Sequence, residues 1–380
     1  MTRRRSATLT LLSCVLLAAP ARADDASAAA PRVQAKSYIL IDYATGTTLA
    51  ESNADEPLPI ASLTKLMTAY VVFEALRDGR IALDDQVLVS EKAWRMRGSR
   101  MFIEVNTHVA VEDLILGLIV QSGNDASVAL AEHVAGSVPA FVELMNAAAE
   151  RLGMTRTTYA NTHGLPAPGA ASTARDQAIL ARALIAEFPE YYPWYSLREF
   201  TYNGIRQYNR NRLLARDPSV DGLKTGHTNA AGYCLVSSAQ RDGMRVISVV
   251  LGADTPAARA ASSQSLIDWG FATYETHRLF AAGEEIVAER VWRGSPELTS
   301  LGVAEDFYVT IPRGRFDALA AEVKLPLRLV APLERLAPVG EVHVSFDGRP
   351  LASAPLVALG AVAQGGPWTR LRDEFMLLLE

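Results

Sequence analysis

The pattern of hydrophobic and polar residues changes once along the chain, near residue 277. Before this point, apolar segments rich in alanine and leucine predict helices over residues 61–77, 110–135, 138–152, 172–188 and 256–274. Shorter apolar segments at 36–50 and 232–252, the second interrupted by the turn Asp242-Gly243, predict antiparallel strands. We therefore expect an α/β (α+β) domain with a central antiparallel sheet over residues 30–278.

Beyond residue 277, apolar and polar residues alternate with a period of two, which is typical of strands that are buried on one face. The alternation is found in the segments "DFYVTIP", "EVKLPLRLV" and "EVHVSFDGRP". Asp347-Gly348 marks a hairpin turn at the end of the last segment. This part of the chain therefore predicts a small, separate all-β domain over residues 279–362.

The final segment, residues 366–380, places Trp368, Leu371, Phe375 and Leu378 at helical spacing. We expect an amphipathic helix that is too short to cross a bilayer. Two interpretations remain open: a peripheral membrane anchor, with the aromatic ring at the headgroups, or a helix packed on the protein. Three acidic residues in the segment count against the anchor, because lipid-binding helices are usually rich in lysine and arginine.

Residues 1–23 have the three parts of a secretory signal peptide. Arginines at positions 3–5 precede an apolar run over residues 7–19, and Ala21-Arg22-Ala23 forms a cleavage site. We expect cleavage rather than an uncleaved anchor, because the apolar run is too short to span a bilayer. The protein is therefore expected to be exported, to the periplasm or to the outer face of the cytoplasmic membrane.

Composition excludes several classes of function. Removal of residues 1–23 takes away four arginines and no acidic residue, which changes the formal net charge from −5 to −9 and argues against nucleic-acid binding. Cys234 is then the one cysteine left, and its apolar neighbours indicate a buried thiol. We expect no cofactor and no metal, because the histidines are dispersed without ligand spacing, at positions 108, 133, 163, 227, 277 and 343.

Candidate chemistry begins in the segment "PIASLTKLMTAY", where Ser62 and Lys65 are three positions apart. Residues at this spacing share one face of a helix, so the hydroxyl and the amine can meet. A serine nucleophile needs a base beside it, and a lysine is a base if burial and nearby cations lower its pKa. Taken alone, the pattern S-x-x-K is also compatible with an exposed serine beside a solvated lysine.

Two further triplets change that interpretation. Ser122–Asn124 follow the apolar run "LILGLIV", and Lys224–Gly226 precede a predicted strand. Separately, the first triplet is compatible with a capped helix start and the second with an ordinary loop. In the order S-x-x-K, S-x-N, K-T-G, the three motifs form the set found in β-lactamases and penicillin-binding proteins. Together they predict a serine enzyme that forms an acyl intermediate.

The segments around these motifs resemble the D-alanyl-D-alanine carboxypeptidases, the low-molecular-mass penicillin-binding proteins that trim bacterial cell-wall peptides. The similar segments are "SLTKLMTAY", "SGNDAS", "NTHGL", "GIRQYNRN", "DGLKTGHTNAAGY" and "SLIDWGF". The β domain and the tail resemble the family's C-terminal domain and its membrane-associated end. The resemblance implies a β-lactamase/transpeptidase-like fold and removal of the terminal D-alanine from peptidoglycan pentapeptide. It also implies β-lactam antibiotics as covalent inhibitors.

The resemblance assigns catalytic roles to the matched residues. Ser62 would be acylated, and Lys65 would be its general base. Ser122 and Lys224 would form a proton path on the other side of the cleft. Arg210, in "YNRN", would support the site or the fold.

The resemblance also assigns binding roles. Asn124 would hold the substrate amide, and the N–H groups of Ser62 and His227 would form an oxyanion hole. In the third motif Thr225 and Gly226 would contact the substrate, with Thr225 at the terminal carboxylate. Arg259, in "TPAARAASSQ", matches the family's carboxylate-binding arginine by position.

Three alternatives remain open. A class A β-lactamase would need a glutamate that activates the deacylating water, and no E-x-x-L-N pattern lies between the second and third motifs. A D,D-endopeptidase that cleaves peptidoglycan cross-links would use the same residues, so the sequence does not separate it from a carboxypeptidase. A non-catalytic wall-binding protein would have no reason to keep all three motifs.

Overall fold

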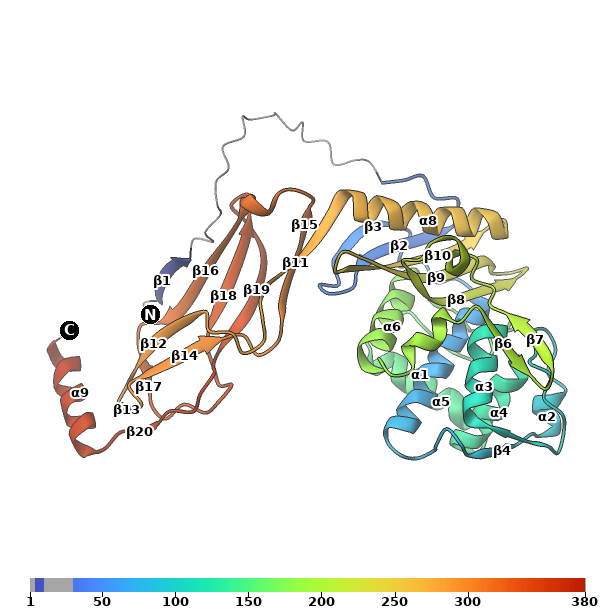
Figure 1. Ribbon diagram of the computed structural model, residues 1–380, viewed down its shortest axis with the longest axis horizontal. Helices are drawn as coiled ribbons and strands as arrows, with labels where there is room; N and C mark the ends of the chain where they lie inside the picture. Colours follow the sequence, from blue (N-terminus) through green and yellow to red (C-terminus); the bar gives the residue numbers. More distant parts are fainter. Residues whose placement is uncertain (1–3, 10–29, 380) are drawn as a thin grey trace. The chain divides into compact units, whose positions relative to one another are not determined.

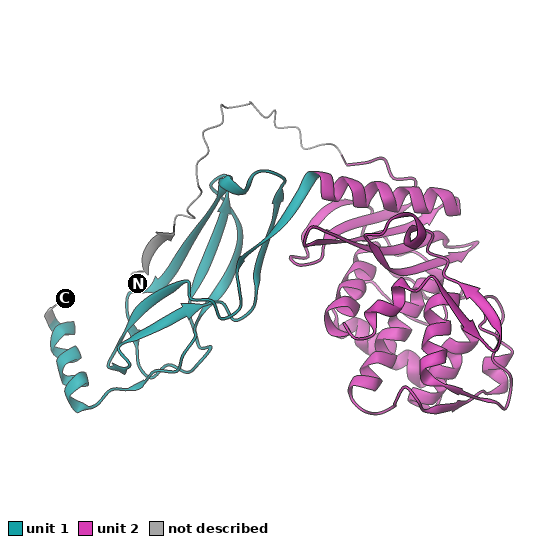
Figure 2. Cartoon of the chain, in the orientation of Figure 1, with its two compact units in different colours: residues 1–27, 273–380 teal, residues 28–272 magenta. Residues whose placement is uncertain are grey.

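The computed structural model describes residues 4–9 and 30–379, and it divides the chain into two compact units. Of the described residues, 30–272 form one unit and 273–379 form the other (Figure 2). The predicted domain boundary at residue 278 falls inside β11 (Tyr274–Phe280), which pairs with β15 (Phe307–Pro312) of the second unit. The structure therefore places the division at residue 273, where α8 (Pro256–Thr273) ends.

The first unit is built on a five-stranded sheet in which every pairing is antiparallel. The strands, in spatial order, are β3 (Thr48–Ser52), β2 (Ser37–Asp42), β10 (Met244–Ala253), β9 (Gly232–Arg241) and β8 (Val220–Thr228). Helix α8 covers one face of the sheet, and α6 (Ala174–Glu187) covers the other (Figure 1). Because β8 is an edge strand, its K-T-G residues are free to face a cleft.

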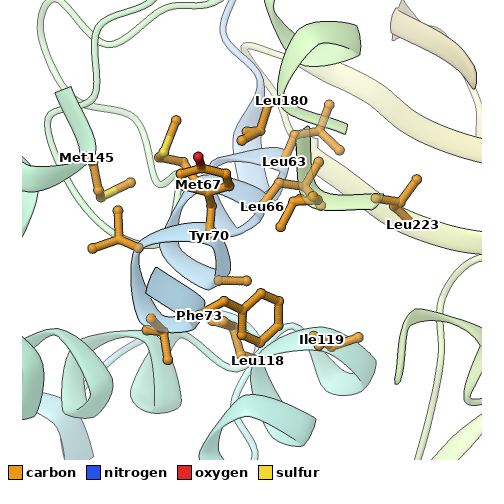
Figure 3. Close-up of a cluster of buried hydrophobic side chains, with 14 of the residues drawn as sticks. Leu63, Leu66, Met67, Tyr70, Phe73, Leu118, Ile119, Met145, Leu180 and Leu223 are labelled. Atoms are coloured by element: carbon orange, nitrogen blue, oxygen red, sulfur yellow. The ribbon is translucent and has the colours of Figure 1, made fainter. Parts of the chain in front are cut away.

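Helix α1 (Thr64–Arg77) is the centre of this unit's core. Almost all of its side chains are buried, because helices and the sheet surround it on several sides. Figure 3 shows its residues Leu66, Met67, Tyr70 and Phe73 packed against residues from other helices and from β8. This all-round burial explains why the segment is apolar without a marked polar face. It also holds the start of the helix, where Ser62 and Lys65 lie, in a fixed position.

The remaining elements of the first unit are short or lie around this core. They are β4 (Gln86–Leu88), α2 (Glu91–Trp94), β5 (His108–Ala110), α3 (Val111–Leu116), α4 (Asn124–Ala135), α5 (Val138–Arg151), β6 (Glu199–Tyr202), β7 (Ile205–Tyr208) and α7 (Leu213–Arg216). The hairpin of β6 and β7 and the strands β4 and β5 were not predicted, since each is brief and mostly exposed.

The helix predicted over residues 110–135 is interrupted, which corrects the sequence-based expectation. Helix α3 passes into a π-turn over Gly117–Gln121, and Ser122 adopts a left-handed conformation with φ of +65° before α4 begins. The apolar residues keep helical spacing through the turn, so the hydrophobic pattern does not reveal the break. The interruption places Ser122 between two helices rather than inside one.

The second unit is all-β with one terminal helix, as predicted. Its main sheet has the order β1-β16-β18-β19-β14-β12-β17, in which β1 (Arg4–Leu9) pairs with β16. The other residues of the predicted signal peptide lie outside the described residues. The further elements are β12 (Val287–Trp292), β13 (Gly294–Ser295), β14 (Leu298–Gly302), β16 (Leu319–Pro326), β17 (Leu329–Val330), β18 (Pro338–Phe346), β19 (Arg349–Ala358), β20 (Ala363–Gln364) and α9 (Pro367–Leu379).

Among the described residues, no single helix is both long and apolar enough to span a membrane. Helices α4 and α5 meet that criterion only as a pair, and the pair is bent by 86°.

Candidate active site

Ser62 lies in a 3₁₀ turn (Ala61–Leu63) that leads directly into α1. Lys65, in the first turn of α1, donates a hydrogen bond from Nζ to Ser62 Oγ over 3.0 Å. The contact that the S-x-x-K spacing predicts is therefore formed. The serine and the amine are at the distance that proton transfer requires.

The Lys65 amine is buried, with 1% of the residue exposed. It donates two further hydrogen bonds, each of 2.7 Å, to Asn124 Oδ1 and to the backbone carbonyl of His163. Burial lowers the pKa of Lys65 well below its usual value of 10.5, and the positive charges of Lys224 and Arg210 lower it further. The charge of Asp125 acts in the opposite direction and raises the pKa, but it is the smallest of the four causes. In the neutral amine, two N–H groups can keep the bonds to Asn124 and His163, which leaves the lone pair for the Ser62 hydroxyl.

The second motif is folded against the loop that precedes it. The backbone N–H of Asn124 donates to the Ser99 carbonyl at 2.8 Å, and its side-chain Nδ2 donates to the Arg97 carbonyl at 2.6 Å. Ser122 Oγ is buried and has no hydrogen-bond partner within the described structure. A buried hydroxyl without a partner is uncommon, and it leaves Ser122 free to take part in proton transfer.

The third motif, Lys224–Gly226, lies within the edge strand β8. A Cβ atom on Gly226 would lie 2.7 Å from the Ile60 carbonyl oxygen and 3.2 Å from the Ser62 backbone nitrogen. Only glycine therefore allows β8 to approach the turn that carries Ser62. This close approach packs β8 against the turn that carries Ser62.

Lys224 is the second buried amine of the site, with 3% of the residue exposed. Burial lowers the pKa of Lys224 to about 7, with contributions from the charges of Arg210 and Arg259. Its Nζ donates a long hydrogen bond of 3.4 Å to the carbonyl of Thr225. A pKa close to neutrality suits an amine that exchanges protons during a reaction.

Arg259 lies on α8, and its side chain contacts the strands β8 and β9. Its guanidinium donates to the carbonyls of Gly226 (3.5 Å) and Cys234 (3.3 Å). The ring of Tyr233 lies 5.8 Å from the guanidinium and stacks on the His227 ring at 4.0 Å between centroids. The Nε of Arg259 is buried without a partner, so the side chain keeps donor capacity for an anion.

These residues surround one cleft with a volume of about 480 Å³. Seven of the nine predicted site residues line it: Ser62, Ser122, Asn124, Thr225, Gly226, His227 and Arg259. Lys65 and Lys224 do not line the cleft and are buried beside it. The structure thus brings three distant segments of the chain together at a single site.

Other cleft residues were not predicted from the sequence. Gly98 and Ser99 line one wall, and Tyr208, Asn209 and Arg212 line another. Tyr208 and Asn209 lie in the segment "GIRQYNRN", whose resemblance to the family could have indicated them, whereas no motif marks Gly98, Ser99 or Arg212. Arg210, expected to support the site, also lines the cleft and donates to Ser99 Oγ at 2.8 Å.

Comparison with known proteins identifies the family. The family model for D-alanyl-D-alanine carboxypeptidase matches residues 24–255, and the model for the C-terminal domain of penicillin-binding protein 5 matches residues 274–364. D-alanyl-D-alanine carboxypeptidase DacC from Escherichia coli is 46% identical over 370 residues, which cover 95% of this chain and 92% of the relative.

Solved structures agree with the family models. Penicillin-binding protein 5 from Haemophilus influenzae matches with a TM-score of 0.84 and 44% identity, covering 88% of this chain and 99% of the relative. Penicillin-binding protein D2 from Listeria monocytogenes, in its ampicillin-bound form, matches with a TM-score of 0.59 and 34% identity. The match covers 63% of this chain and 98% of the relative. The predicted fold and family are confirmed, and the chain belongs to the D-alanyl-D-alanine carboxypeptidases, which are serine-type hydrolases.

Proposed function

We propose that Ser62 carries the acyl group when the enzyme removes the terminal D-alanine from peptidoglycan pentapeptide, with Lys65 as the general base. The contact between Lys65 Nζ and Ser62 Oγ is the observation that supports this assignment most directly. Because its pKa is lowered, the amine is available in its neutral form and takes the serine proton as Oγ attacks the penultimate D-alanine carbonyl.

The proton must then reach the nitrogen of the leaving D-alanine. Ser122 Oγ has no protein partner, and the pKa of Lys224 lies near 7, so both groups suit the transfer. We assign them to the path by which the leaving amine is protonated as the C–N bond breaks. Water then hydrolyses the ester on Ser62 and releases the shortened peptide.

The remaining site residues bind and orient the substrate. The N–H groups of Ser62 and His227 form the oxyanion hole, and a donor of this kind typically contributes about 3 kcal/mol to transition-state stabilisation. Thr225 and Arg259 bind the terminal carboxylate, for which a hydroxyl and a guanidinium are matched donors. Asn124 holds the substrate amide through the second N–H of Nδ2, since its first N–H bonds the Arg97 carbonyl.

A β-lactam should acylate Ser62 and remain attached. The cleft has no acidic residue among those that line it, and the nearby Asp125 already accepts backbone N–H bonds from Met101 and Phe102. No carboxylate is therefore placed to activate a deacylating water as in class A β-lactamases. After mixing with benzylpenicillin, intact-protein mass spectrometry should show one added penicilloyl group that persists over many minutes.

The control for this experiment is a class A β-lactamase treated in parallel, which should show free penicilloic acid and unmodified protein. Rapid release of penicilloic acid by the purified chain would contradict the prediction and favour the β-lactamase alternative.

We further propose that the enzyme works outside the cytoplasmic membrane and contacts its surface through α9. The acidic residues of this helix are engaged with the β domain: the buried Asp373 accepts from Arg290 (3.0 Å) and from the Arg293 N–H (2.6 Å), and Glu374 pairs with Arg293 at 3.1 Å. The acids therefore do not lie on the apolar face.

That apolar face is open to solvent. Trp368, Phe375 and Leu378 are 82%, 64% and 84% exposed. Exposed aromatic and aliphatic side chains on one face of a helix are typical of binding at a lipid interface. This distribution supports the anchor interpretation more than a helix packed by its apolar face on the protein.

Replacing Trp368 and Phe375 by serine should abolish binding to lipid vesicles. Each loss removes a large apolar surface that would enter the headgroup region. Co-sedimentation with vesicles of phosphatidylethanolamine and phosphatidylglycerol measures the bound fraction. The control variant replaces Leu327 and Leu351 of the β domain by serine. These two leucines are 40% and 41% exposed. Equal binding by both variants, or no binding by the wild type, would contradict the anchor.

A further inference from the structure

Residues 161–165, with the sequence "NTHGL", form a loop that packs against the catalytic turn but belongs to none of the three motifs. We call it the NTHGL loop. Gly164 has a φ of +83°, and a Cβ atom at this position would overlap the carbonyl oxygen of Ala61, the residue before Ser62. Only glycine therefore fits where the loop passes this turn, and the course of the loop is fixed against the site.

Two consecutive carbonyls of the NTHGL loop are bound by side chains of α1. The His163 carbonyl accepts from Lys65 Nζ at 2.7 Å. Three positions further along the helix, and on the same face, Thr68 Oγ1 donates to the Thr162 carbonyl at 2.7 Å. Ser127 Oγ, on α4, donates to the same Thr162 carbonyl at 2.7 Å. The loop is thus held against the helix that carries the base.

Asn161 closes the NTHGL loop through its side-chain amide. Its Oδ1 accepts the backbone N–H groups of His163 at 3.2 Å and of Gly164 at 2.6 Å. Its Nδ2 donates to the Leu165 carbonyl at 2.9 Å. The Gly164 N–H and the His163 carbonyl belong to the same planar peptide unit. Asn161 therefore holds this unit at its N–H, while Lys65 binds it at its carbonyl.

We propose that Asn161 is a positioning residue for the general base. It fixes the peptide unit that follows His163, so the carbonyl of that unit stays directed at Lys65 Nζ. With two N–H groups of the neutral amine held by acceptors, the lone pair faces Ser62 Oγ. Asn161 does not line the catalytic cleft, so it acts through this peptide unit and not on the substrate. The inference rests on the proposed role of Lys65 as the base.

The charged groups that act most on Lys65 belong to other elements. They are, in order of effect, Lys224 on β8, Arg210 before α7 and Asp125 on α4. Burial is the main cause of the lowered pKa of Lys65; the two cations lower the pKa further, and the carboxylate raises it. Burial also lowers the pKa of the His163 imidazole to about 4, with smaller effects from the charges of Lys65 and Lys92. That ring is uncharged near neutral pH, so the NTHGL loop itself adds no charge beside the base.

Replacing Asn161 by alanine or by aspartate tests this role in the purified full chain. Alanine removes the acceptor of both N–H groups, so the carbonyl that holds the base is no longer fixed. The acylation rate on its high-pH plateau should then fall about 10–100-fold, the usual effect of misplacing a catalytic group. Stopped-flow acylation by a β-lactam, from about pH 5 to pH 10, measures this rate.

Asn161→Asp separates positioning from a merely structural role. A carboxylate still accepts both N–H groups, so this variant should retain most of the plateau rate. Its negative charge would lie one peptide unit from the Lys65 amine and favour the charged form of that amine. The pKa of Lys65 should therefore rise, which moves the acid limb of the rate profile to higher pH by about one unit.

The matched control is Asn146 on α5, which holds the chain just before the NTHGL loop. Its Oδ1 accepts the Tyr159 N–H at 2.8 Å, and its Nδ2 donates to the Tyr159 carbonyl at 2.9 Å. Asn146→Ala and Asn146→Asp therefore remove comparable hydrogen bonds without touching the peptide unit that Lys65 binds. Both control variants should keep the plateau rate and the pH profile of the wild type.

Two results would overturn the inference and leave the proposed function intact. One is a wild-type plateau rate for Asn161→Ala, and the other is the same pH profile for Asn161→Asp and Asn146→Asp. If Asn161→Ala does not fold, Asn161→Asp decides alone, because it keeps the acceptor that closes the loop. A wild-type acylation rate for Lys65→Met would instead overturn the proposed function, since Lys65 would not be the base.

Discussion

Replacing Ser62 by alanine should abolish both turnover of pentapeptide and covalent labelling by penicillin. The substitution removes the atom that forms the ester, while the cleft and its hydrogen-bond donors remain. Loss of a serine nucleophile typically lowers kcat by about 10⁴–10⁶-fold. Release of D-alanine from pentapeptide and labelling with a fluorescent penicillin measure the two effects.

The control is Ser137→Ala, which removes a hydroxyl at the start of α5. Ser137 Oγ accepts a hydrogen bond from the Ala140 N–H, so this variant loses a helix cap and some stability but keeps the site. Labelling that survives Ser62→Ala and disappears with Ser122→Ala would show that the nucleophile is misassigned.

Replacing Lys65 by methionine should slow acylation by about 10²–10⁴-fold, the usual contribution of a general base. Methionine fills a similar volume but cannot accept a proton. Lys65→Arg should fail as well, because a guanidinium stays charged at all relevant pH values.

The acylation rate of the wild type should fall as the pH is lowered and Lys65 takes up its proton. Stopped-flow measurements with a β-lactam, from pH 5 to 10, test all three expectations.

The matched control is Lys92→Met, which changes an exposed lysine of α2. It should keep the rate and the pH profile of the wild type. An unaltered acylation rate in Lys65→Met would exclude Lys65 as the base and direct attention to Lys224.

Lys65 should also make the free energy of unfolding depend on pH. Its pKa in the folded protein lies well below the usual 10.5, chiefly through burial. In the pH window between the folded pKa and 10.5, the unfolded chain therefore binds one proton more than the folded chain. The unfolding free energy of the wild type therefore rises with pH across the window. Lys65→Met lacks this rise, so the stability of the wild type relative to the variant should be greatest near pH 10.5 and decrease as the pH falls. Urea titrations at several pH values measure the difference.

Local signals in the sequence were sufficient for most elements of the fold. The pairing of β9 with β10 through Asp242 and Gly243, both with positive φ, follows from the turn residues. The start of α6 follows from Thr173, whose side chain accepts from the Asp176 N–H at 3.0 Å. These features depend on residues close in sequence, which is why a pattern reveals them. The π-turn before Ser122 is held by distant contacts, in which the Gln121 carbonyl accepts from Ser99 Oγ and the Gln121 side chain donates to the Arg100 carbonyl, and no local pattern marks it.

For the site, the motifs were enough to predict which side chains would carry the chemistry. They indicate a nucleophile, a base and a set of donors, because acyl transfer to serine requires those groups. Their local spacing also predicted the contact of Ser62 with Lys65, since a helical turn sets that distance.

The environment of those groups, by contrast, depends on how the chain folds. The lowered pKa values of Lys65 and Lys224 come from burial and from mutual repulsion between cations on separate elements. The approach of β8 to Ser62 and the free hydroxyl of Ser122 likewise arise where distant segments meet. Electrostatic and packing effects act through space, and the order of residues along the chain does not record the distances on which they depend.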